Sequence, residues 1–173
     1  HPEVCRLFTA RVIRGVKVGP SPAWLKTALE SIGQRSINNV VDVTNFIAAE
    51  LGNPCHVFDL ARLEGRALVI RYAHEGEPLV TLDAKKRALK SDELVVADAR
   101  RATSLAGVIG GQDSEVTGAT TDVVFEMATW DPVTIRRAAR RLGIRTDASY
   151  RFERIVDPRM IDEAARRAAA LII

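Results

Sequence analysis

Residues 35–59 read RSINNVVDVTNFIAAELGNPCHVFD and contain the pattern around which the rest of the chain is organised. An asparagine at position 38 or 39 can cap a helix over residues 40–51, and Gly52 can end it. Arginine, asparagine, aspartate, threonine and histidine lie among the apolar residues of this stretch. Polar groups beside a core must be hydrogen-bonded, or they lower stability. The stretch therefore builds either a structural hydrogen-bond network or a pocket, and we favour a pocket.

Upstream of this stretch, the chain predicts one strand and one helix. Residues 8–18, FTARVIRGVKV, are rich in Val and Ile and predict a strand that breaks near Gly15. Ser21 is the expected cap of a helix that has Pro22 at its first position and ends at Gly33. Helical spacing predicts a buried face made of Trp24, Leu25, Ala28, Leu29 and Ile32.

Downstream, the pattern changes to β structure. Turn residues separate three predicted strands, which cover residues 67–73, 78–83 and 93–99. A basic cluster lies at one of the turns and consists of Lys85, Lys86 and Arg87. This cluster predicts either a solvated loop or a contact with an RNA backbone.

Two later segments leave a structural and a functional interpretation open. Residues 104–111, SLAGVIGG, predict either a strand that bends at its glycines or a backbone that approaches a ligand closely. Residues 121–128, TDVVFEMA, predict a strand in which Glu126 shares a face with Val124. Glu126 then either faces solvent or is a buried carboxylate that needs a hydrogen-bond donor.

An arginine-rich segment follows. Asp131 and Pro132 begin a predicted helix that Gly143 ends. Its basic residues are Arg136, Arg137, Arg140 and Arg141. Seven arginines lie between residues 136 and 154 against two acidic residues, which predicts contact with nucleic acid or with the rest of a larger protein. A final helix is expected to begin at residues 157–158.

The composition is that of a globular domain. The chain has 173 residues, of which 47% are hydrophobic and 27% charged, and its net charge of +3 is too small to identify a partner. No apolar run approaches the roughly 20 residues of a membrane span, so we expect no membrane contact. Cys5 and Cys55 do not form a disulfide framework, and their spacing from the histidines does not fit zinc. We therefore predict a reducing, cytoplasmic location and no metal site.

The ends of the chain resemble those of a fragment. The sequence begins at His1 without a methionine and finishes in an apolar run over residues 168–173. We expect one domain over residues 1–158. Residues 159–173 would then be the start of a helix that leads to a further, absent domain.

Five motifs, in this order, resemble one known family: RSINNVVDVTNF, NPCHVFD, LAGVIGGQDS, VVFEMATWDP and RTDASYRFERIVDP. Together they resemble the editing domain of the bacterial-type phenylalanyl-tRNA synthetase beta subunit. The resemblance implies a mixed α/β (α+β) fold whose β-sandwich-like core of unusual topology is flanked by helices, as in a domain of tRNA-lysidine synthetase. It also implies that residues 1–158 hydrolyse mischarged Tyr-tRNA(Phe).

The resemblance also implies a set of site residues. Catalytic roles fall on Thr44, Asn45 and His56. Substrate binding falls on Arg35, Ala106, Gly107, Glu126, Thr146 and Ala148. No metal is implied in this fragment, whereas ATP and Mg²⁺ belong to the full synthetase. The implied partners are the 3′ end of tRNA(Phe) carrying tyrosine, the rest of the beta subunit, and the alpha subunit in a heterotetramer.

The chemistry of editing explains this choice of residues. Tyrosine differs from phenylalanine by one hydroxyl, which a hydrophobic pocket cannot strongly reject. An ionised Glu126 would accept the phenol proton, and it would be left unpaired by phenylalanine. Arg35 would hold a phosphate or the CCA end, and His56 would orient water or act as a general base. No serine or cysteine nucleophile arrangement is present, so we expect attack by water, and a ribose hydroxyl of the tRNA is a candidate assistant.

Two other interpretations remain open. In the first, the chain is a non-catalytic structural or tRNA-binding module of the synthetase, and Glu126 and His56 only satisfy polar groups of the core. In the second, it is a small-molecule hydrolase that uses Cys55.

Overall fold

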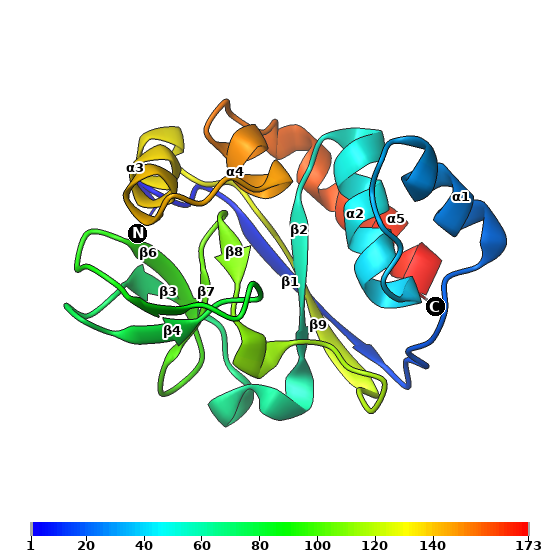
Figure 1. Ribbon diagram of the computed structural model, residues 1–173, viewed down its shortest axis with the longest axis horizontal. Coiled ribbons are helices and arrows are strands. Elements are labelled where there is room, and N and C mark those ends of the chain that lie inside the picture. Colours follow the sequence, from blue (N-terminus) through cyan, green and yellow to red (C-terminus); the bar gives the residue numbers. More distant parts are fainter. Residues whose placement is uncertain (1, 173) are drawn as a thin grey trace.

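The computed structural model describes residues 2–172 and has the predicted mixed α/β fold, with antiparallel sheets and flanking helices (Figure 1). His1 and Ile173, at the outer ends of the predicted ranges, lie outside the described residues. The strands are β1 Phe8–Arg14, β2 Cys55–Asp59, β3 Val69–Tyr72, β4 Pro78–Val80, β5 Lys86–Ala88, β6 Leu94–Ala97, β7 Ala102–Leu105, β8 Ile109–Gly110 and β9 Asp122–Ala128. The α-helices are α1 Ala23–Ser31, α2 Asn39–Leu51, α3 Pro132–Leu142, α4 Asp147–Phe152 and α5 Ile161–Ile172. The short 3-10 helices are η1 Leu60–Arg62, η2 Glu64–Arg66, η3 Gln112–Ser114 and η4 Pro158–Met160.

One antiparallel sheet brings distant parts of the chain together. Its strand order is β1-β9-β2, so the late strand β9 lies between two early strands. Side chains alternate along β9, as predicted. Phe125 and Met127 point into the core under the helices, whereas Val124 belongs to the core on the opposite face. Both faces of β9 are therefore covered.

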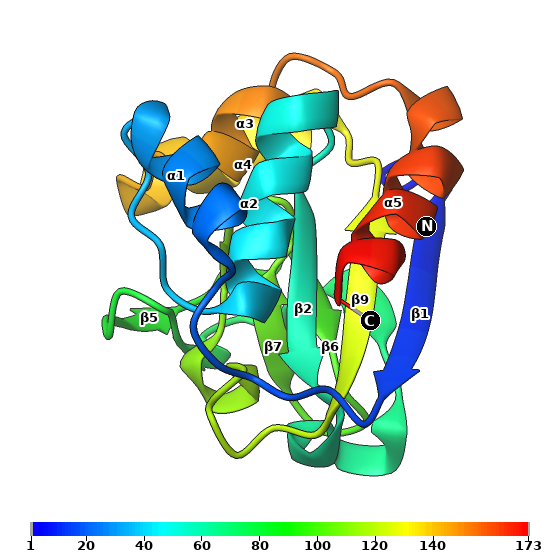
Figure 2. The same ribbon diagram turned by 90° about the vertical axis from the view of Figure 1, so that its right-hand side faces the viewer.

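Helices α2 and α5 cover one face of this sheet, and α1 packs on α2 (Figure 2). Leu25 and Leu29 of α1 meet Val43 and Ile47 of α2 in that core. Each fully buried aliphatic side chain contributes about 1.5–3 kcal/mol through the hydrophobic effect. Helix α5 packs there through Ile161, Ala164, Ala165 and Ala168. Residues 161–172 are thus part of this core, and the predicted domain boundary near residue 158 stays a prediction.

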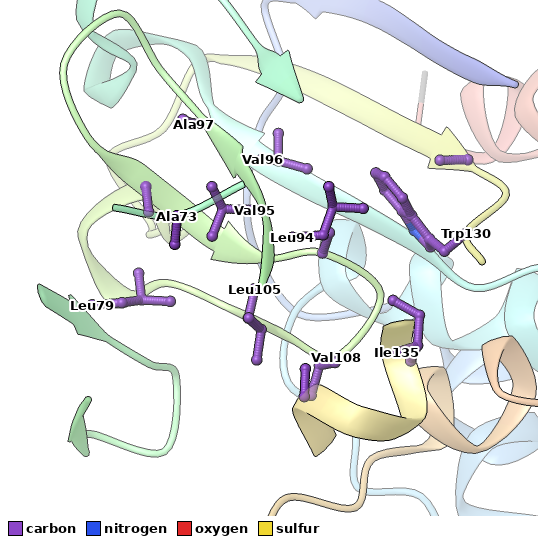
Figure 3. Packing of buried hydrophobic residues seen from close by; sticks show 14 of the residues in the cluster. Ala73, Leu79, Leu94, Val95, Val96, Ala97, Leu105, Val108, Trp130 and Ile135 are labelled. Atoms are coloured by element: carbon purple, nitrogen blue, oxygen red, sulfur yellow. The ribbon is translucent and has the colours of Figure 1, made fainter. Parts of the chain in front are cut away.

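The second sheet has the order β3-β6-β7-β8 and confirms the predicted strands near residues 67–73 and 93–99. Its core side chains meet the end of the first sheet and helix α3. Figure 3 shows Leu94 beside Trp130, and Val108 beside Ile135 of α3. A separate ribbon of β4 and β5 joins this sheet through a bridge between Thr81 and Gly111.

Helix boundaries follow the predicted caps in two cases. The Asn38 side chain accepts hydrogen bonds from the amides of Val40 and Val41, and left-handed Gly52 ends α2. Asp131 caps α3 in the same way, by accepting from the Thr134 amide at 2.8 Å. The predictions for α2 and α3 are therefore confirmed.

The prediction for the first helix is partly wrong. Pro22 is the cap residue of α1, whereas Ser21 donates instead to the buried Asp42 carboxylate at 2.5 Å. Trp24 is 50% exposed, and Ile32 is 56% exposed. A helix of nine residues lying on α2 buries only a narrow stripe, and Trp24 instead stacks edge-on against Phe46.

Two segments for which no helix or strand was predicted are ordered by local and tertiary contacts. Lys86 and Arg87 belong to β5, and the Arg87 guanidinium pairs with Asp83 at 2.7 Å, whereas Lys85 and Lys86 are exposed, as the solvated interpretation predicts. Residues 147–152 form α4, a helix that was not predicted from the sequence. Thr146 and Ser149 cap that helix reciprocally, each side chain accepting from the other's backbone amide.

Candidate functional site

A cavity of about 450 Å³ lies where α2 and α4 meet strands β2, β8 and β9. Most of the predicted site residues line it: Thr44, Asn45, His56, Gly107, Glu126, Thr146 and Ala148. Apolar side chains complete the walls, including Val41, Val57, Leu105, Trp130 and Phe152. The predicted site therefore comes together from segments about 100 residues apart in the sequence.

Glu126 lies on the central strand β9 and is 5% exposed, so the prediction of a buried carboxyl group is confirmed and the solvent-facing alternative is wrong. Its Oε2 atom has no hydrogen-bond partner within residues 2–172. Burial raises the pKa of Glu126 to about 8, because a low-dielectric surrounding disfavours the charged form. The editing chemistry predicts an ionised carboxylate, whereas the burial of Glu126 favours the neutral acid at pH 7.

His56 lies directly opposite Glu126 in the pairing of β2 with β9. Residues opposite each other in an antiparallel pair project from the same face, with Cβ atoms about 5 Å apart. The Nε2 atom of His56 is buried and has no partner in the described part of the chain. Burial lowers the pKa of His56 to about 4, so the ring is neutral at pH 7. The imidazole and the Phe58 ring pack edge to face, with ring centroids 4.5 Å apart.

Glu126 and His56 are therefore two uncharged polar groups of the cavity lining, and each has at least one buried atom without a partner among residues 2–172. A buried polar atom without a partner costs roughly 1–3 kcal/mol. Such a cost is recovered when a ligand supplies the missing hydrogen bond. Glu126 and His56 are thus suited to bind a ligand that carries polar groups on an otherwise apolar body.

The glycines after β7 make room for this arrangement. A Cβ atom on Gly110 would lie 2.4 Å from Cε1 and 2.8 Å from Nε2 of His56. A Cβ atom on Gly107, which has φ of +64°, would lie 2.7 Å from Trp130. The predicted bend of residues 104–111 is confirmed at Gly107, whereas a close approach of this backbone to a ligand stays a prediction; the neighbour that the backbone at Gly110 approaches is the His56 ring. Gly110 was not predicted as a site residue, although the glycine-rich pattern marked its segment.

The two threonine hydroxyls of the site are already engaged. Thr44 donates to the Val41 carbonyl at 2.6 Å within α2. Thr146 donates to the Val108 carbonyl at 2.7 Å and thereby ties the start of α4 to the turn between β7 and β8. In this structure both hydroxyls shape the cavity wall, and the Asn45 side chain adds an amide to the lining.

Arg35 and Ala106 do not line the cavity. Arg35 is exposed, and Ala106 is buried, with its amide donating to the Leu94 carbonyl at 3.0 Å. Buried Asp42 holds the segment after Arg35 in place by accepting from the Ser36 hydroxyl at 2.5 Å and the Ile37 amide at 2.8 Å.

Several residues at the cavity were not predicted. Ile37, Leu82, Glu115 and Asp147 line it as well. The Leu82 amide donates to the Gly110 carbonyl at 3.0 Å, which brings the β4–β5 ribbon against the site. No motif in the sequence marked Leu82, because its position depends on this contact between segments.

Cys55 lines the cavity next to His56. Its thiol donates to the Thr44 carbonyl at 3.6 Å, and burial, with the nearby Glu126 carboxyl, raises its pKa above the usual range. A thiolate is the nucleophilic form of cysteine, so this surrounding opposes the use of Cys55 as a nucleophile.

Residues 2–172 contain no group of three or more His, Cys, Asp or Glu side chains arranged to hold a metal ion. Within the same residues, no helix is long and apolar enough to cross a bilayer.

The fold and the cavity define a class of protein: a mixed α/β domain that encloses a largely apolar cavity with a few buried polar groups. The chain belongs to the B3/4 domain family, whose model matches residues 4–173.

Its curated relatives are much longer proteins. The chain is 53% identical over 171 residues to the phenylalanine–tRNA ligase beta subunit of Anaeromyxobacter dehalogenans, covering 99% of this chain and 21% of that protein. It is 52% identical to the same subunit of Syntrophotalea carbinolica, with the same coverage. The chain therefore spans about a fifth of the length of these relatives.

A solved structure has a similar fold. It is an N-terminal fragment of the phenylalanyl-tRNA synthetase beta subunit from Pyrococcus horikoshii, with a TM-score of 0.55 and 13% identity. The match covers 82% of this chain and 45% of that fragment.

Proposed function

We propose that this chain is the proofreading domain of a phenylalanine–tRNA ligase beta subunit and hydrolyses the tyrosyl ester of tRNA(Phe). The observation that carries the proposal is the Glu126 carboxyl group, buried in the cavity with an unpartnered oxygen. The identity of the RNA and of the amino acid is inferred from the similar ligase beta subunits, because those relatives are named for phenylalanine and tRNA.

Recognition of tyrosine would depend on Glu126. A neutral carboxyl group can both donate to and accept from a phenol, so the tyrosine hydroxyl would satisfy the unpartnered oxygen. The phenylalanine ring would displace water from the same place and offer no partner, at a cost of roughly 1–3 kcal/mol. The site would therefore select the hydroxylated ester, which the synthetic site of the ligase cannot strongly reject.

Hydrolysis would use water near His56. The neutral imidazole has an available Nε2 atom, which can accept a hydrogen bond from the attacking water. Asn45 offers an amide from α2 to the ester or the terminal ribose. Arg35, exposed and outside the cavity, would meet the RNA rather than the amino acid. The wall formed by Gly107 and Ala148 would face the aromatic ring.

The rest of the ligase would supply the other functions. Aminoacylation with ATP and Mg²⁺ would belong to regions outside this chain, as would contacts to the alpha subunit in a heterotetramer. A cytoplasmic location follows from the same proposal.

Deacylation of Tyr-tRNA(Phe) tests the proposal. The whole ligase that contains this chain should release tyrosine faster than phenylalanine, and Glu126→Ala should remove most of that difference. Glu30→Ala, on the exposed side of α1, is the matched control and should have no effect. If the whole ligase does not deacylate Tyr-tRNA(Phe), the editing function is refuted and the non-catalytic interpretation gains support.

The role of the ribose hydroxyl is a separate question. A Tyr-tRNA(Phe) whose free terminal hydroxyl has been removed should be hydrolysed more slowly if that hydroxyl assists the water. An unchanged rate would refute this assistance, and hydrolysis would then depend on water near His56 without the ribose hydroxyl.

A further inference from the structure

The positive charge of the chain is concentrated in one segment. Residues 136–154 contain seven arginines and two acidic residues, a net charge of +5, whereas the whole chain has +3. The remaining residues therefore sum to −2. Arg141 is paired with buried Glu93 at 2.5 Å. The excess positive charge of the segment therefore lies on its other arginines.

Part of this segment forms an aromatic and basic surface. The Tyr150 side chain on α4 is 43% exposed. The Arg154 guanidinium lies 3.7 Å from the centre of its ring, and that of Arg145 lies 5.4 Å away. Arg136 of α3 donates to the Glu153 carbonyl at 3.0 Å, which brings a third guanidinium to the same place. We call Arg136, Arg145, Tyr150 and Arg154 the arginine–tyrosine patch.

The patch carries more positive charge than its neighbours neutralise. Glu153 pairs with Arg154, and it is the one carboxylate bonded to the patch in the described part of the chain. The Asp147 carboxylate, nearby in sequence, accepts from Gln34 at 2.9 Å instead. Arg136 and Arg145 have no ion pair within residues 2–172, and both side chains are exposed. The patch is therefore a place where an anion would be attracted.

The patch lies next to the cavity. Helix α4 lines the cavity with Ala148 and Phe152, and Tyr150 projects from another side of the same helix. The width of a helix with its side chains, about 10 Å, therefore separates the two surfaces. Figure 1 shows α3 and α4 at the same end of the molecule. A strand of RNA whose last ribose lies at the cavity mouth would reach the patch within a few nucleotides.

We propose that the arginine–tyrosine patch binds the single-stranded 3′ end of the RNA whose ester enters the cavity. The guanidiniums would contact phosphates, and the exposed part of the Tyr150 ring would stack on a base. The inference rests on the proposed function, because that function supplies the RNA. An exposed aromatic ring beside guanidiniums favours RNA over an acidic protein surface, which would need the charges but not the ring.

Binding of a short RNA to the whole chain tests the proposal without hydrolysis. The probe is a single-stranded RNA ending in CCA, labelled with fluorescein at its 5′ end, and the readout is anisotropy at several salt concentrations. Tyr150→Ala should weaken binding roughly 5- to 100-fold through lost stacking. Arg145→Gln and Arg154→Gln should each weaken binding and reduce the slope of log K against log salt by roughly 0.7.

Matched controls separate this surface from general effects. Trp24→Ala removes an exposed aromatic side chain on α1, and Arg100→Gln removes an exposed charge at the β6–β7 turn. Both should bind the RNA like the wild type, and circular dichroism should show that every variant is folded.

Two results would overturn the proposal. One is an RNA that does not bind the wild-type chain at low salt. The other is binding that Tyr150→Ala and the arginine variants leave unchanged, in which case the patch would face another part of the longer polypeptide. Failure of the proposed function looks different: the RNA would bind through the patch, but the whole ligase would not hydrolyse Tyr-tRNA(Phe).

Discussion

The Glu126→Gln substitution should change how the free energy of unfolding depends on pH. The variant keeps the size and hydrogen-bonding groups of the neutral acid but cannot titrate. Burial raises the pKa of Glu126 from 4.5 in the unfolded chain to about 8 in the folded one. Between these pH values the folded wild type holds a proton that the unfolded chain has lost. Its stability therefore falls as pH rises through this range, and the stabilising contribution is complete only below pH 4.5.

The magnitude follows from the shift. Each pH unit between the two pKa values removes about 1.4 kcal/mol from the wild type relative to the Glu126→Gln variant. From pH 5.5 to pH 7.5 the wild type should lose about 2–3 kcal/mol relative to the variant. His56 contributes with the opposite sign, because its folded pKa is lowered to about 4 and its stabilisation is lost as pH falls. That contribution is present in both proteins and cancels in the comparison.

Urea unfolding provides the measurement. Trp130, which is buried beside the cavity, reports unfolding by its fluorescence. Unfolding curves for both proteins at several pH values between about 5 and 8 give the difference in free energy at each pH. The free energy of unfolding of the wild type minus that of the Glu126→Gln variant should fall steadily as the pH is raised.

A constant difference across this range would refute the reasoning. Glu126 would then be ionised in the folded protein, stabilised by a partner such as a charged His56. Recognition of tyrosine would in that case rest on a carboxylate that only accepts a hydrogen bond.

Three further substitutions test other contacts. Gly110→Ala should displace the His56 ring, lower stability by about 1–3 kcal/mol and slow Tyr-tRNA(Phe) hydrolysis, because its Cβ would lie 2.4 Å from the ring. Arg141→Ala should lower the free energy of unfolding by about 3 kcal/mol, because it leaves the buried Glu93 carboxylate without its guanidinium. Ile155→Gly should raise it by about 1 kcal/mol, because Ile155 is 76% exposed and has φ of +72°.

Each of these substitutions has a matched control, measured by the same urea unfolding. Gly118→Ala meets nothing within 4 Å and should be close to neutral. Arg140→Ala removes the exposed neighbour of Arg141 and should change stability by about 0.5 kcal/mol or less. Ile155→Ala keeps a Cβ in the left-handed conformation and should gain less than the glycine variant. If a substitution and its control change the free energy of unfolding equally, the structural reason given for that substitution is wrong.

Local signals predicted α2 and α3 well, because their caps are made by adjacent residues. Asn38 and Asp131 each accept from amides two or three positions away, so the sequence contains the whole interaction. Helix α4 was missed for the opposite reason. It has six residues, and a bond from Thr146 to the distant Val108 carbonyl holds its first turn. Short helices are marginal without such tertiary support.

The sequence by itself determined which polar residues accompany the core, that Glu126 and Val124 share a face of one strand, and where helices α2 and α3 begin and end. It could not determine whether Glu126 meets water, because that depends on what covers both faces of β9. Only the tertiary structure placed His56 opposite Glu126 and closed the cavity with α4 and the glycines before η3. The physical reason is that burial and the pKa of a side chain are set by atoms packed around it, and here those atoms come from residues about 70 positions earlier.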